Sequence, residues 1–407
     1  MVALGLAYWA LGDRHQSEKT FEYTSTAFLQ RGNWDGVVSS LCYMGIMQFK
    51  HGQLQSAFDT YTEALARATR PDGVKILFAS IPSPRIGNLL REWNDLVRAQ
   101  DFIDSGIALA AKLNHPDVLI ESYICLARLR HVFKDQKGVM EALNKAEIIL
   151  GKNQVDPWYL GWLDECWVSY WISTGNLPAA ISQIERRGLT FDEPLSYQHD
   201  LHHTNLAHVL IAQGLQDPSG PYLDQAEKLL DRLQKAAEKA DWVHETIKIL
   251  ILKGLLFWTA GEKERSVDVL IQSLTLAEPG GYVRIFVDEG GPMEDLLSYI
   301  LLKGGMRKED DTKISAYADR LLKTMQKEKQ ELPFLESREM SNLAEPLSYR
   351  ELEVLRFLNT LLSSTEIAQE LSISANTVRF HIKNIYGKLS VNRRADAVQR
   401  AKELGIL

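Results

Sequence analysis

Apolar residues recur at helical spacing almost throughout residues 1–277, and short polar turns interrupt them at regular intervals. The turns fall about 40 residues apart, near Gly12, Gly52, Asn94, Lys134, Gly175, Gly214 and Gly261. A small residue often follows about five positions later, as Ala57, Ala99, Ala180 and Ser266 do. We expect the two helices of a hairpin to approach closely there. Self-similarity of this kind is typical of an α-solenoid, whose hairpins bury their apolar faces against each other.

The repeated segments resemble tetratricopeptide repeats of a long-period kind, and they predict a helical-repeat sensor or interaction region over residues 1–277. We interpret "DPSGPYL" (217–223) as an insertion within one repeat. Met1 falls inside what should be the first helix of a repeat, with no N-cap before it. We therefore expect the chain to be truncated at its N-terminal end.

A connecting segment and linker are expected over residues 278–346. A Gly-bounded apolar run and a short helix occupy 278–305, and a further helix is predicted over 314–330. Residues 328–346 have mixed charge, two prolines and no apolar period. This composition predicts an irregular linker.

Residues 347–407 divide into four short helices, which makes the whole chain all-α. Ser348 and Ser363 each precede a Glu by three residues, the pattern of a capping box, and Ser374 is placed to cap the third helix. A short helix, a tight turn and a second helix in so small a unit predict a helix-turn-helix domain.

The third helix of this unit lies in "SISANTVRFHIKNIYGKL" (372–389) and has two different faces. At about 100° per residue, its core face consists of Val378, Ile382, Ile385, Tyr386 and Leu389, and its outer face of Asn376, Arg379, Phe380, Lys383 and Gly387. His381 flanks the core and is expected to be structural. Lys and Arg can reach phosphates or guanine edges in a major groove, and an apolar side chain can contact a thymine methyl. A merely solvated charged face is the alternative; Phe380 argues against it.

The charge distribution points to the same end of the chain. The net charge is −7, yet residues 376–402 carry seven Lys or Arg against Asp396 alone. A cationic block on an acidic body is the distribution expected of a chain that binds nucleic acid through one end.

Residues 347–407 resemble the LuxR-type helix-turn-helix domain over their whole length. The matching stretches are "LSYRELEVL", "EIAQELSISANTVRFHIKNIYGKL" and "RRADAVQRAKELGIL". The resemblance implies that the third helix enters the major groove of double-stranded DNA and that the fourth mediates dimerisation. It implies main DNA contacts at Thr377, Arg379, Phe380 and Lys383, backbone contacts at Asn384, Lys388 and Arg394, and dimer or core positions at Val398 and Ala401.

Several positions depart from that family pattern. Leu361 stands where a Gly is usual after the first helix, Gly387 where a basic residue is usual, and Ser390 where a Gly usually ends the third helix. Phe380 replaces a small or polar residue. These departures indicate an altered sequence preference and weaker DNA binding within the same fold.

Helical repeats that end in "AEPGGYVRIFVDEGGPMEDLL" and precede a LuxR-type domain resemble the C-terminal part of the MalT-like ATP-binding LuxR regulators, which are bacterial. That resemblance implies repeats that sense an inducer and an ATP-binding domain upstream of them. No G-x-x-x-x-G-K-[ST] occurs in this chain, so we expect no cofactor here.

Two further clusters of side chains are candidates for binding sites. His199 and His203 are spaced i,i+4, but no Cys or Glu completes a zinc site, so we expect no metal and a solvent-facing helix. "WYLGWLDECWVSYW" contains Trp158, Trp162, Trp167 and Trp171. Core packing is the default interpretation of these rings. The alternative is an aromatic inducer pocket on the concave solenoid face, with Asp164 and Glu165 as polar contacts.

The remaining features exclude other classes of protein. Three widely separated cysteines predict reduced thiols in a cytoplasmic protein, and no run of apolar residues predicts a membrane span. Catalytic motifs are absent, so we expect no enzymatic activity. The sequence thus predicts a DNA-binding transcriptional regulator, dimeric or larger on DNA, whose repeats receive a small molecule or a protein. A repeat-protein scaffold with a degenerate DNA-binding domain is the alternative.

Overall fold

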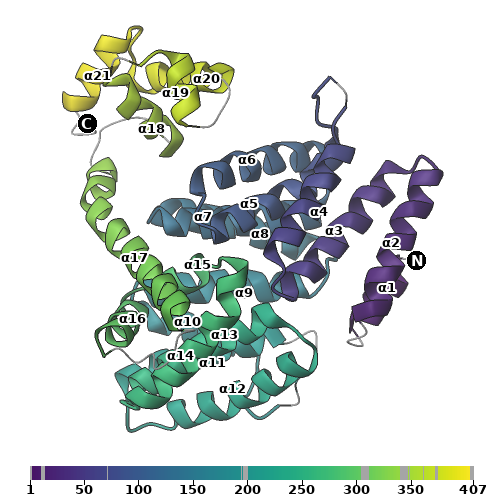
Figure 1. Cartoon of the computed structure of the whole chain (residues 1–407), viewed down its shortest axis with the longest axis vertical. Coiled ribbons are helices and arrows are strands. Elements are labelled where there is room, and N and C mark those ends of the chain that lie inside the picture. Colours follow the sequence, from purple (N-terminus) through teal and green to yellow (C-terminus); the bar gives the residue numbers. More distant parts are fainter. Residues whose placement is uncertain are drawn as a thin grey trace. The chain divides into compact units, whose positions relative to one another are not determined.

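Helices make up all the regular secondary structure of the described residues, apart from an isolated bridge between Thr69 and Lys75. The computed structural model describes residues 2–10, 14–70, 72–193, 195, 200–303, 311–339, 347, 349–360, 362–371 and 375–403. The chain forms two compact units, Met1–Met325 and Gln326–Leu407 (Figure 1). The prediction of an all-α chain is confirmed.

Within the described part of the first unit, seven helical hairpins follow one another (Figure 1). They are α1 (Val2–Ala10) with α2 (Arg14–Gln30), α3 (Trp34–Lys50) with α4 (Leu54–Arg67), α5 (Pro82–Glu92) with α6 (Leu96–Leu113), α7 (Pro116–Val132) with α8 (Gln136–Lys152), α9 (Trp158–Ser173) with α10 (Leu177–Glu185), α11 (Asp200–Gln216) with α12 (Tyr222–Lys239), and α13 (Val243–Thr259) with α14 (Lys263–Ala277). A short 3-10 helix, η1 (Leu77–Ser80), precedes α5.

Most of the predicted turn positions adopt the conformation that ends a helix. Gly52, Asn94, Lys134, Gly175 and Gly261 all have positive φ. In each case the next residue donates its N–H back across the last helical turn, as Gln53 does to the carbonyl of Gln48 at 2.8 Å. This is the Schellman arrangement, which satisfies carbonyls that the helix leaves open. Gly12 lies outside the described residues.

The turn predicted near Gly214 is wrong. Gly214 lies inside α11, and "DPSGPYL" supplies the connection to α12 instead of an insertion within a repeat. A Cβ at Gly214 would lie 2.3 Å from a methyl group of Leu223. This glycine therefore lets the two helices of a hairpin approach, a role that sequence alone does not distinguish from a turn.

The small residues that follow the turns lie where the helices of a hairpin meet. Ala57, Ala99, Ala180 and Ser266 are fully buried. The hydroxyl of Ser266 donates to the carbonyl of Gly254 at 2.7 Å. The expected close approach is confirmed at these positions.

The segment after the hairpins contains η2 (Glu278–Gly280), α15 (Arg284–Val287), α16 (Gly291–Lys303) and α17 (Asp311–Glu339). The helix expected over 314–330 is therefore longer at both ends, and residues 328–339 of the expected linker are helical. Lys, Glu, Gln and Leu dominate this stretch, and their high helix propensity does not require an apolar period.

The solenoid curves until distant repeats touch. α3 contacts α13, where the rings of Phe49 and His244 lie tilted against each other with centroids 4.4 Å apart. The end of α5 meets the segment around α15, since Arg91 donates to Asp288 at 2.7 Å although the two residues are 197 apart in sequence. The first helices of the hairpins consequently face a common interior.

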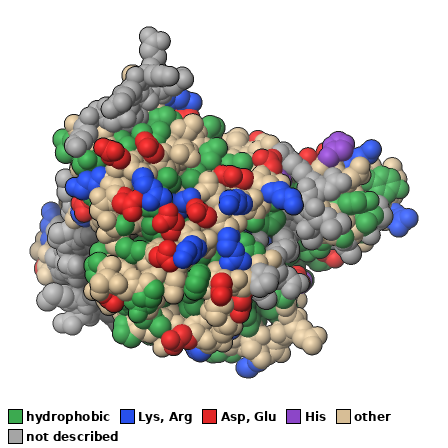
Figure 2. Space-filling view, turned by 90° about the horizontal axis from the view of Figure 1, so that it is seen from below, with side chains coloured by type: hydrophobic (Ala, Val, Ile, Leu, Met, Phe, Trp, Pro, Cys, Tyr) green, Lys and Arg blue, Asp and Glu red, His purple; other side chains and the backbone are tan. Residues whose placement is uncertain are grey.

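The outer surface of the repeats carries charges of both signs. Figure 2 shows one face on which cations and carboxylates are interspersed. Exposed ion pairs tie α12 to its neighbours, for example Arg265 with Glu227 at 2.6 Å and Lys253 with Asp231 at 2.7 Å. Charged surfaces of mixed sign favour solubility, and exposed ion pairs of this kind contribute little to the free energy of unfolding.

The second unit contains the four expected helices, α18 (Tyr349–Leu358), α19 (Ser364–Glu370), α20 (Ala375–Leu389) and α21 (Arg394–Glu403). Their apolar faces share one core, which includes Leu352, Val354 and Ile367. The capping box at Ser363 is confirmed, with the Glu366 carboxylate accepting the Ser363 N–H at 2.8 Å. Ser348, Leu361 and Ser374 lie outside the described residues.

No helix among the described residues combines the length and the apolar character needed to span a bilayer. Cys42, Cys125 and Cys166 are all free and buried. Burial raises the pKa of Cys42 to about 11 and that of Cys125 to about 12. These thiols are therefore protonated and unreactive at neutral pH.

Candidate nucleic-acid interface and interior cavity

α20 has the two faces that its sequence predicts. Val378, Ile385 and Leu389 are buried, and Ile382 and Tyr386 pack partly buried against the same core. On the opposite side Asn376, Arg379, Phe380, Lys383 and Gly387 are exposed. His381 is buried, as expected of a structural histidine.

Phe380 is the unusual member of the outer face. Its side chain is 60% exposed, although a ring of this size is normally buried. Beside it, Arg379 donates to the side-chain oxygen of Asn376 at 2.9 Å, which orients the guanidinium along the helix. Lys383 lies one turn further on. A cation, an aromatic ring and a second cation thus lie together on the exposed face of α20.

Two of the residues expected to contact the DNA backbone have partners inside the domain. The ammonium of Lys388 lies 2.9 Å from the carboxylate of Glu351, whose side chain is only 4% exposed. Arg394 donates to carbonyl oxygens at the end of α18, including those of Leu358 and Thr360, each at 2.9 Å. Both side chains support the fold of the unit, and their contact with DNA stays a prediction.

The remaining expected site residues lie at the margins of this surface. Thr377 and Asn384 are half-buried. Ala401 is fully buried in the core of the unit, and Val398 packs against that core. Of the two alternatives for these last positions, the core role is the one that the described contacts show.

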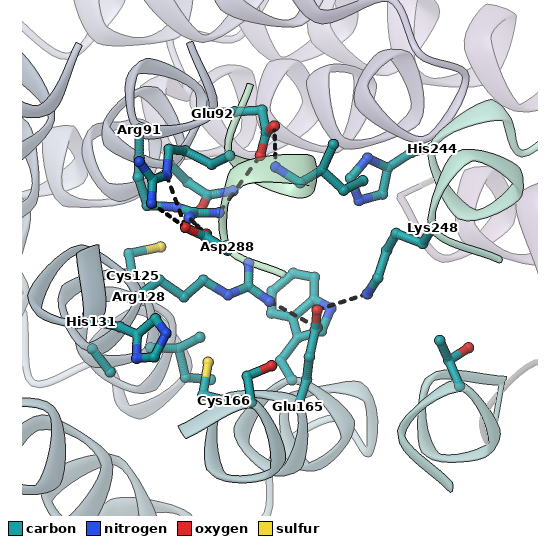
Figure 3. A pocket seen from close by; sticks show the side chains of 18 of the residues that line it. Arg91, Glu92, Cys125, Arg128, His131, Glu165, Cys166, His244, Lys248 and Asp288 are labelled. Carbon is teal, nitrogen blue, oxygen red and sulfur yellow. Dashed lines mark hydrogen bonds and ion pairs between the residues drawn. The ribbon is translucent and has the colours of Figure 1, made fainter. Parts of the chain in front are cut away.

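The first helices of the second to seventh hairpins surround a cavity of about 240 Å³, which segment 284–289 also lines. Figure 3 shows its wall, where charged side chains from several helices converge. The lining includes six Lys or Arg (Lys50, Arg85, Arg91, Arg128, Lys248 and Arg284) and six Asp or Glu (Glu92, Glu121, Glu165, Glu245, Asp288 and Glu289). Charges of both signs thus lie in the cavity wall in equal number, among apolar side chains.

One carboxylate in the wall serves two cations. Glu165 on α9 accepts from Arg128 on α7 at 2.9 Å and from Lys248 on α13 at 2.7 Å, and Figure 3 shows all three converging. Burial raises the pKa of Glu165, but the two cations outweigh burial and hold the pKa at about 2. This carboxylate is ionised at every physiological pH.

A second shared carboxylate lies where the solenoid closes. Asp288 accepts from Arg91 at 2.7 Å and from Arg284 at 2.9 Å. Beside it, Glu92 accepts the backbone N–H groups of Val283 at 3.2 Å and Ile285 at 2.9 Å. The cavity wall and the ring closure are thus built from the same residues.

Two histidines of the wall, His131 and His244, are neutral at physiological pH. Burial lowers the pKa of both His131 and His244 to about 4. His208 faces Glu289 at 3.5 Å, and burial raises the pKa of that carboxyl. His131 and His244 therefore add no positive charge to the cavity at physiological pH.

The tryptophan cluster is divided between core and cavity. Trp167 is buried and stacks on Trp171 at 5.4 Å, and Trp158 packs against the same core. Trp162 lines the cavity. Asp164 is fully buried and bound by Gln183 and Arg187, whereas its neighbour Glu165 faces the cavity. Core packing thus holds for all four tryptophans, and the inducer pocket stays a prediction in which Asp164 cannot be a polar contact.

The prediction that the histidine cluster lies on a solvent-facing helix is wrong. His202 and His203 are buried, and His202 lies 3.1 Å from Asp164. The helix is an inner one, so its polar residues turn into the repeats. His199 lies outside the described residues, and among those described no group of three His, Cys, Asp or Glu could hold a metal ion.

Most of the cavity residues were missed by sequence reasoning. Arg85, Arg128 and Lys248 belong to helices that have buried residues on all sides although they carry several polar residues. A charge on a helix that is buried all round must face an interior polar site. Which helices share that site depends on the curvature of the solenoid.

Comparison with known proteins covers both units. The family model for the MalT-like TPR region matches residues 1–303, and the model for bacterial regulatory proteins of the luxR family matches residues 345–401. The HTH-type transcriptional regulator MalT of Cronobacter sakazakii is 26% identical over 407 residues, which cover 97% of this chain and 44% of that protein. The chain thus spans less than half the length of this relative.

Among solved structures, a circular tandem repeat protein with novel repeat topology and enhanced subunit contact surfaces is similar to this chain at 12% identity. The match covers 100% of this chain and 96% of the other, with a TM-score of 0.19. A score this low does not support a common fold.

Proposed function

Because the chain belongs to the family of the MalT-like TPR region and carries a luxR-family regulatory domain, we propose that it is a sequence-specific DNA-binding transcriptional regulator. Its helical repeats receive a signal from a small molecule or a protein. It acts by binding, without catalysis and without a cofactor of its own, as a cytoplasmic protein that is dimeric or larger on DNA.

The exposed triplet of Arg379, Phe380 and Lys383 on α20 carries this proposal. An α-helix fits the major groove, where Lys and Arg bind guanine edges and phosphates and an apolar ring can meet a thymine methyl. The core face of α20 is anchored in the domain, so the helix presents these side chains rigidly. The half-buried Thr377 and Asn384 flank them.

Substituting Lys383 tests the proposal. In a titration against DNA selected from a random-sequence pool, Lys383→Ala should weaken binding by about 1–3 kcal/mol if Lys383 reads a base. Lys402→Ala is the matched control, since Lys402 is an exposed lysine on α21 outside this triplet. Selection that enriches no sequence, together with an unchanged affinity in Lys383→Ala, would refute the regulator.

A repeat-protein scaffold is the second candidate. The observation that favours it is the small number of cations left for phosphates, because Lys388 and Arg394 are engaged inside the domain and Gly387 carries no side chain. Under this alternative the same titration shows only weak binding without sequence preference. Its affinity would fall steeply with salt for all DNA sequences alike.

A further inference from the structure

Phe380 is the one large apolar side chain that is exposed among the described residues of the second unit. A single exposed apolar residue has no special role by itself, but the position of Phe380 sets it apart. At about 100° per residue, Asn376 and Gly387 fall between Phe380 and Lys383 around α20, and all four are exposed. The ring and the ammonium group thus lie on either side of the centre of the outer face.

The core of the second unit does not use this ring. Val378, Ile385 and Leu389 hold α20 to that core, and Phe380 is not among the residues that pack there. The ring meets the neighbouring His381 edge-on, with the two centroids 5.8 Å apart. Most of the ring therefore keeps its apolar surface in water, and covering that surface releases free energy.

The face that carries Phe380 can be approached closely. An open hollow on it is lined by Arg379, Lys383, Gly387 and Asn392, among others. A Cβ at Gly387 would meet nothing within 4 Å, so the glycine leaves space that no other side chain fills. A partner that contacts Lys383 here also comes within reach of Phe380, which lies about one turn before it on the helix.

The major groove offers one apolar group to such a ring. The base edges there present hydrogen-bond donors and acceptors, and the C5-methyl group of thymine is the exception. A donor or acceptor placed against the ring would lose its water without gaining a partner. Phe380 therefore fits a pyrimidine that carries a methyl group at C5.

We propose that Phe380 determines specificity by selecting a C5-methylated pyrimidine, thymine or 5-methylcytosine, in the DNA that α20 contacts. The recognised group is the methyl group, since the hydrogen-bonding edges of these two bases differ. This inference rests on the proposed DNA-binding function and names the chemical feature of the DNA that the site selects.

Base analogues that differ only by this methyl group test the proposal. A sequence is selected from a random pool with the full chain, and each thymine is replaced singly by deoxyuridine. At one position the replacement should weaken binding about fourfold, the loss expected for about 0.8 kcal/mol per buried methyl-sized group. At that position 5-methylcytosine should bind about fourfold more tightly than cytosine. Competition titrations followed by fluorescence anisotropy measure both pairs.

Substitution of Phe380 assigns the effect to its ring. Phe380→Ala should bind thymine and deoxyuridine equally at that position, and likewise cytosine and 5-methylcytosine. Leu302→Ala, at an exposed apolar residue of α16, is the control and should keep both preferences. The thermal transition of Phe380→Ala should match that of the unsubstituted chain, because the ring lies outside the core. If this variant does not fold, Phe380→Gln replaces it.

The outcomes separate this inference from the proposed function. Selection that enriches a sequence, followed by equal affinity within either pair of bases, overturns the role of Phe380 and leaves the regulator intact. Methyl preferences that persist in Phe380→Ala or Phe380→Gln overturn it as well, because another group then contacts the methyl. Selection that enriches no sequence removes the regulator and this inference together.

Discussion

Ser390 is a non-glycine residue at a position whose backbone conformation favours glycine. It follows α20 with φ of 56°, in the left-handed region that favours glycine. The next residue, Val391, donates to the carbonyl of Tyr386 at 2.9 Å and so completes the Schellman turn. The turn requires this conformation, and a side chain at this position is strained.

Ser390→Gly should therefore stabilise the second unit by about 0.5–1 kcal/mol, because glycine adopts positive φ without the steric cost of a Cβ. Native-state hydrogen exchange of the α20 amides measures the effect within this unit. Ser364→Gly, in the first turn of the helical α19, is the control and should give no stabilisation. The strain at Ser390 would be contradicted if Ser364→Gly slowed the exchange, or if Ser390→Gly failed to slow it.

At the scale of an element, Arg394 provides hydrogen bonds to the carbonyl groups at the C-terminal end of α18. Arg394 belongs to α21, yet its guanidinium donates to the carbonyls of Phe357 at 3.0 Å and Leu362 at 2.6 Å. It also donates to the carbonyls of Leu358 and Thr360. The last carbonyls of a helix otherwise lack partners. One side chain thus ties the last helix of the unit to the first.

Arg394→Ala should destabilise the second unit by about 2–3 kcal/mol, since several charge-assisted hydrogen bonds are lost. Arg394→Lys should be nearly as unstable, because an ammonium cannot reproduce the planar fork of a guanidinium. Urea unfolding followed by circular dichroism measures both, and Arg393→Ala at the exposed neighbouring arginine is the control. An Arg394→Ala variant of full stability but reduced DNA affinity would instead indicate a phosphate contact.

At the scale of the whole repeat unit, stability depends on charges that the curved solenoid encloses. Contacts between α3 and α13, and between α5 and the segment at α15, close the ring of repeats. The residues at these contacts include Arg91, Glu92 and His244. The interior polar network therefore contributes to both the cavity and the closure.

Acid should lower the free energy of unfolding of this unit in a defined pH window. The pKa of His131 and of His244 is about 4 in the folded state, lowered by burial from 6.5. Between pH 6.5 and 4 the unfolded chain binds more protons than the folded one, so the free energy of unfolding falls as pH falls. Urea unfolding at pH 7, 6 and 5 measures the slope.

His244→Gln should flatten that slope, because it removes one of the groups that titrate between the two pKa values. His15→Gln provides the control, since His15 is exposed on α2. Stability that is constant from pH 7 to 5 in the unsubstituted chain would contradict the buried neutral histidines. Below pH 4.5 the loss should continue as Glu165, with its pKa of about 2, is protonated in the unfolded state first.

The sequence by itself determined the features that depend on local periodicity. The helical repeats, their positive-φ turns, the capping box at Ser363 and the two faces of α20 all follow from residues within a few positions of each other. Local rules suffice there because helix geometry places i, i+3 and i+4 neighbours on one side. The same rules were ambiguous at Gly214, where a turn and a close helix approach both require glycine.

Only the tertiary structure decided which charges meet. Glu165, Arg128 and Lys248 come from three different helices, and Arg91 pairs with Asp288 across 197 positions of sequence. The tertiary structure also decided that Lys388 and Arg394 contact partners inside their own domain. Ion pairing acts through space at a few ångströms, and those distances are set by the curvature and packing of whole helices, which no local pattern encodes.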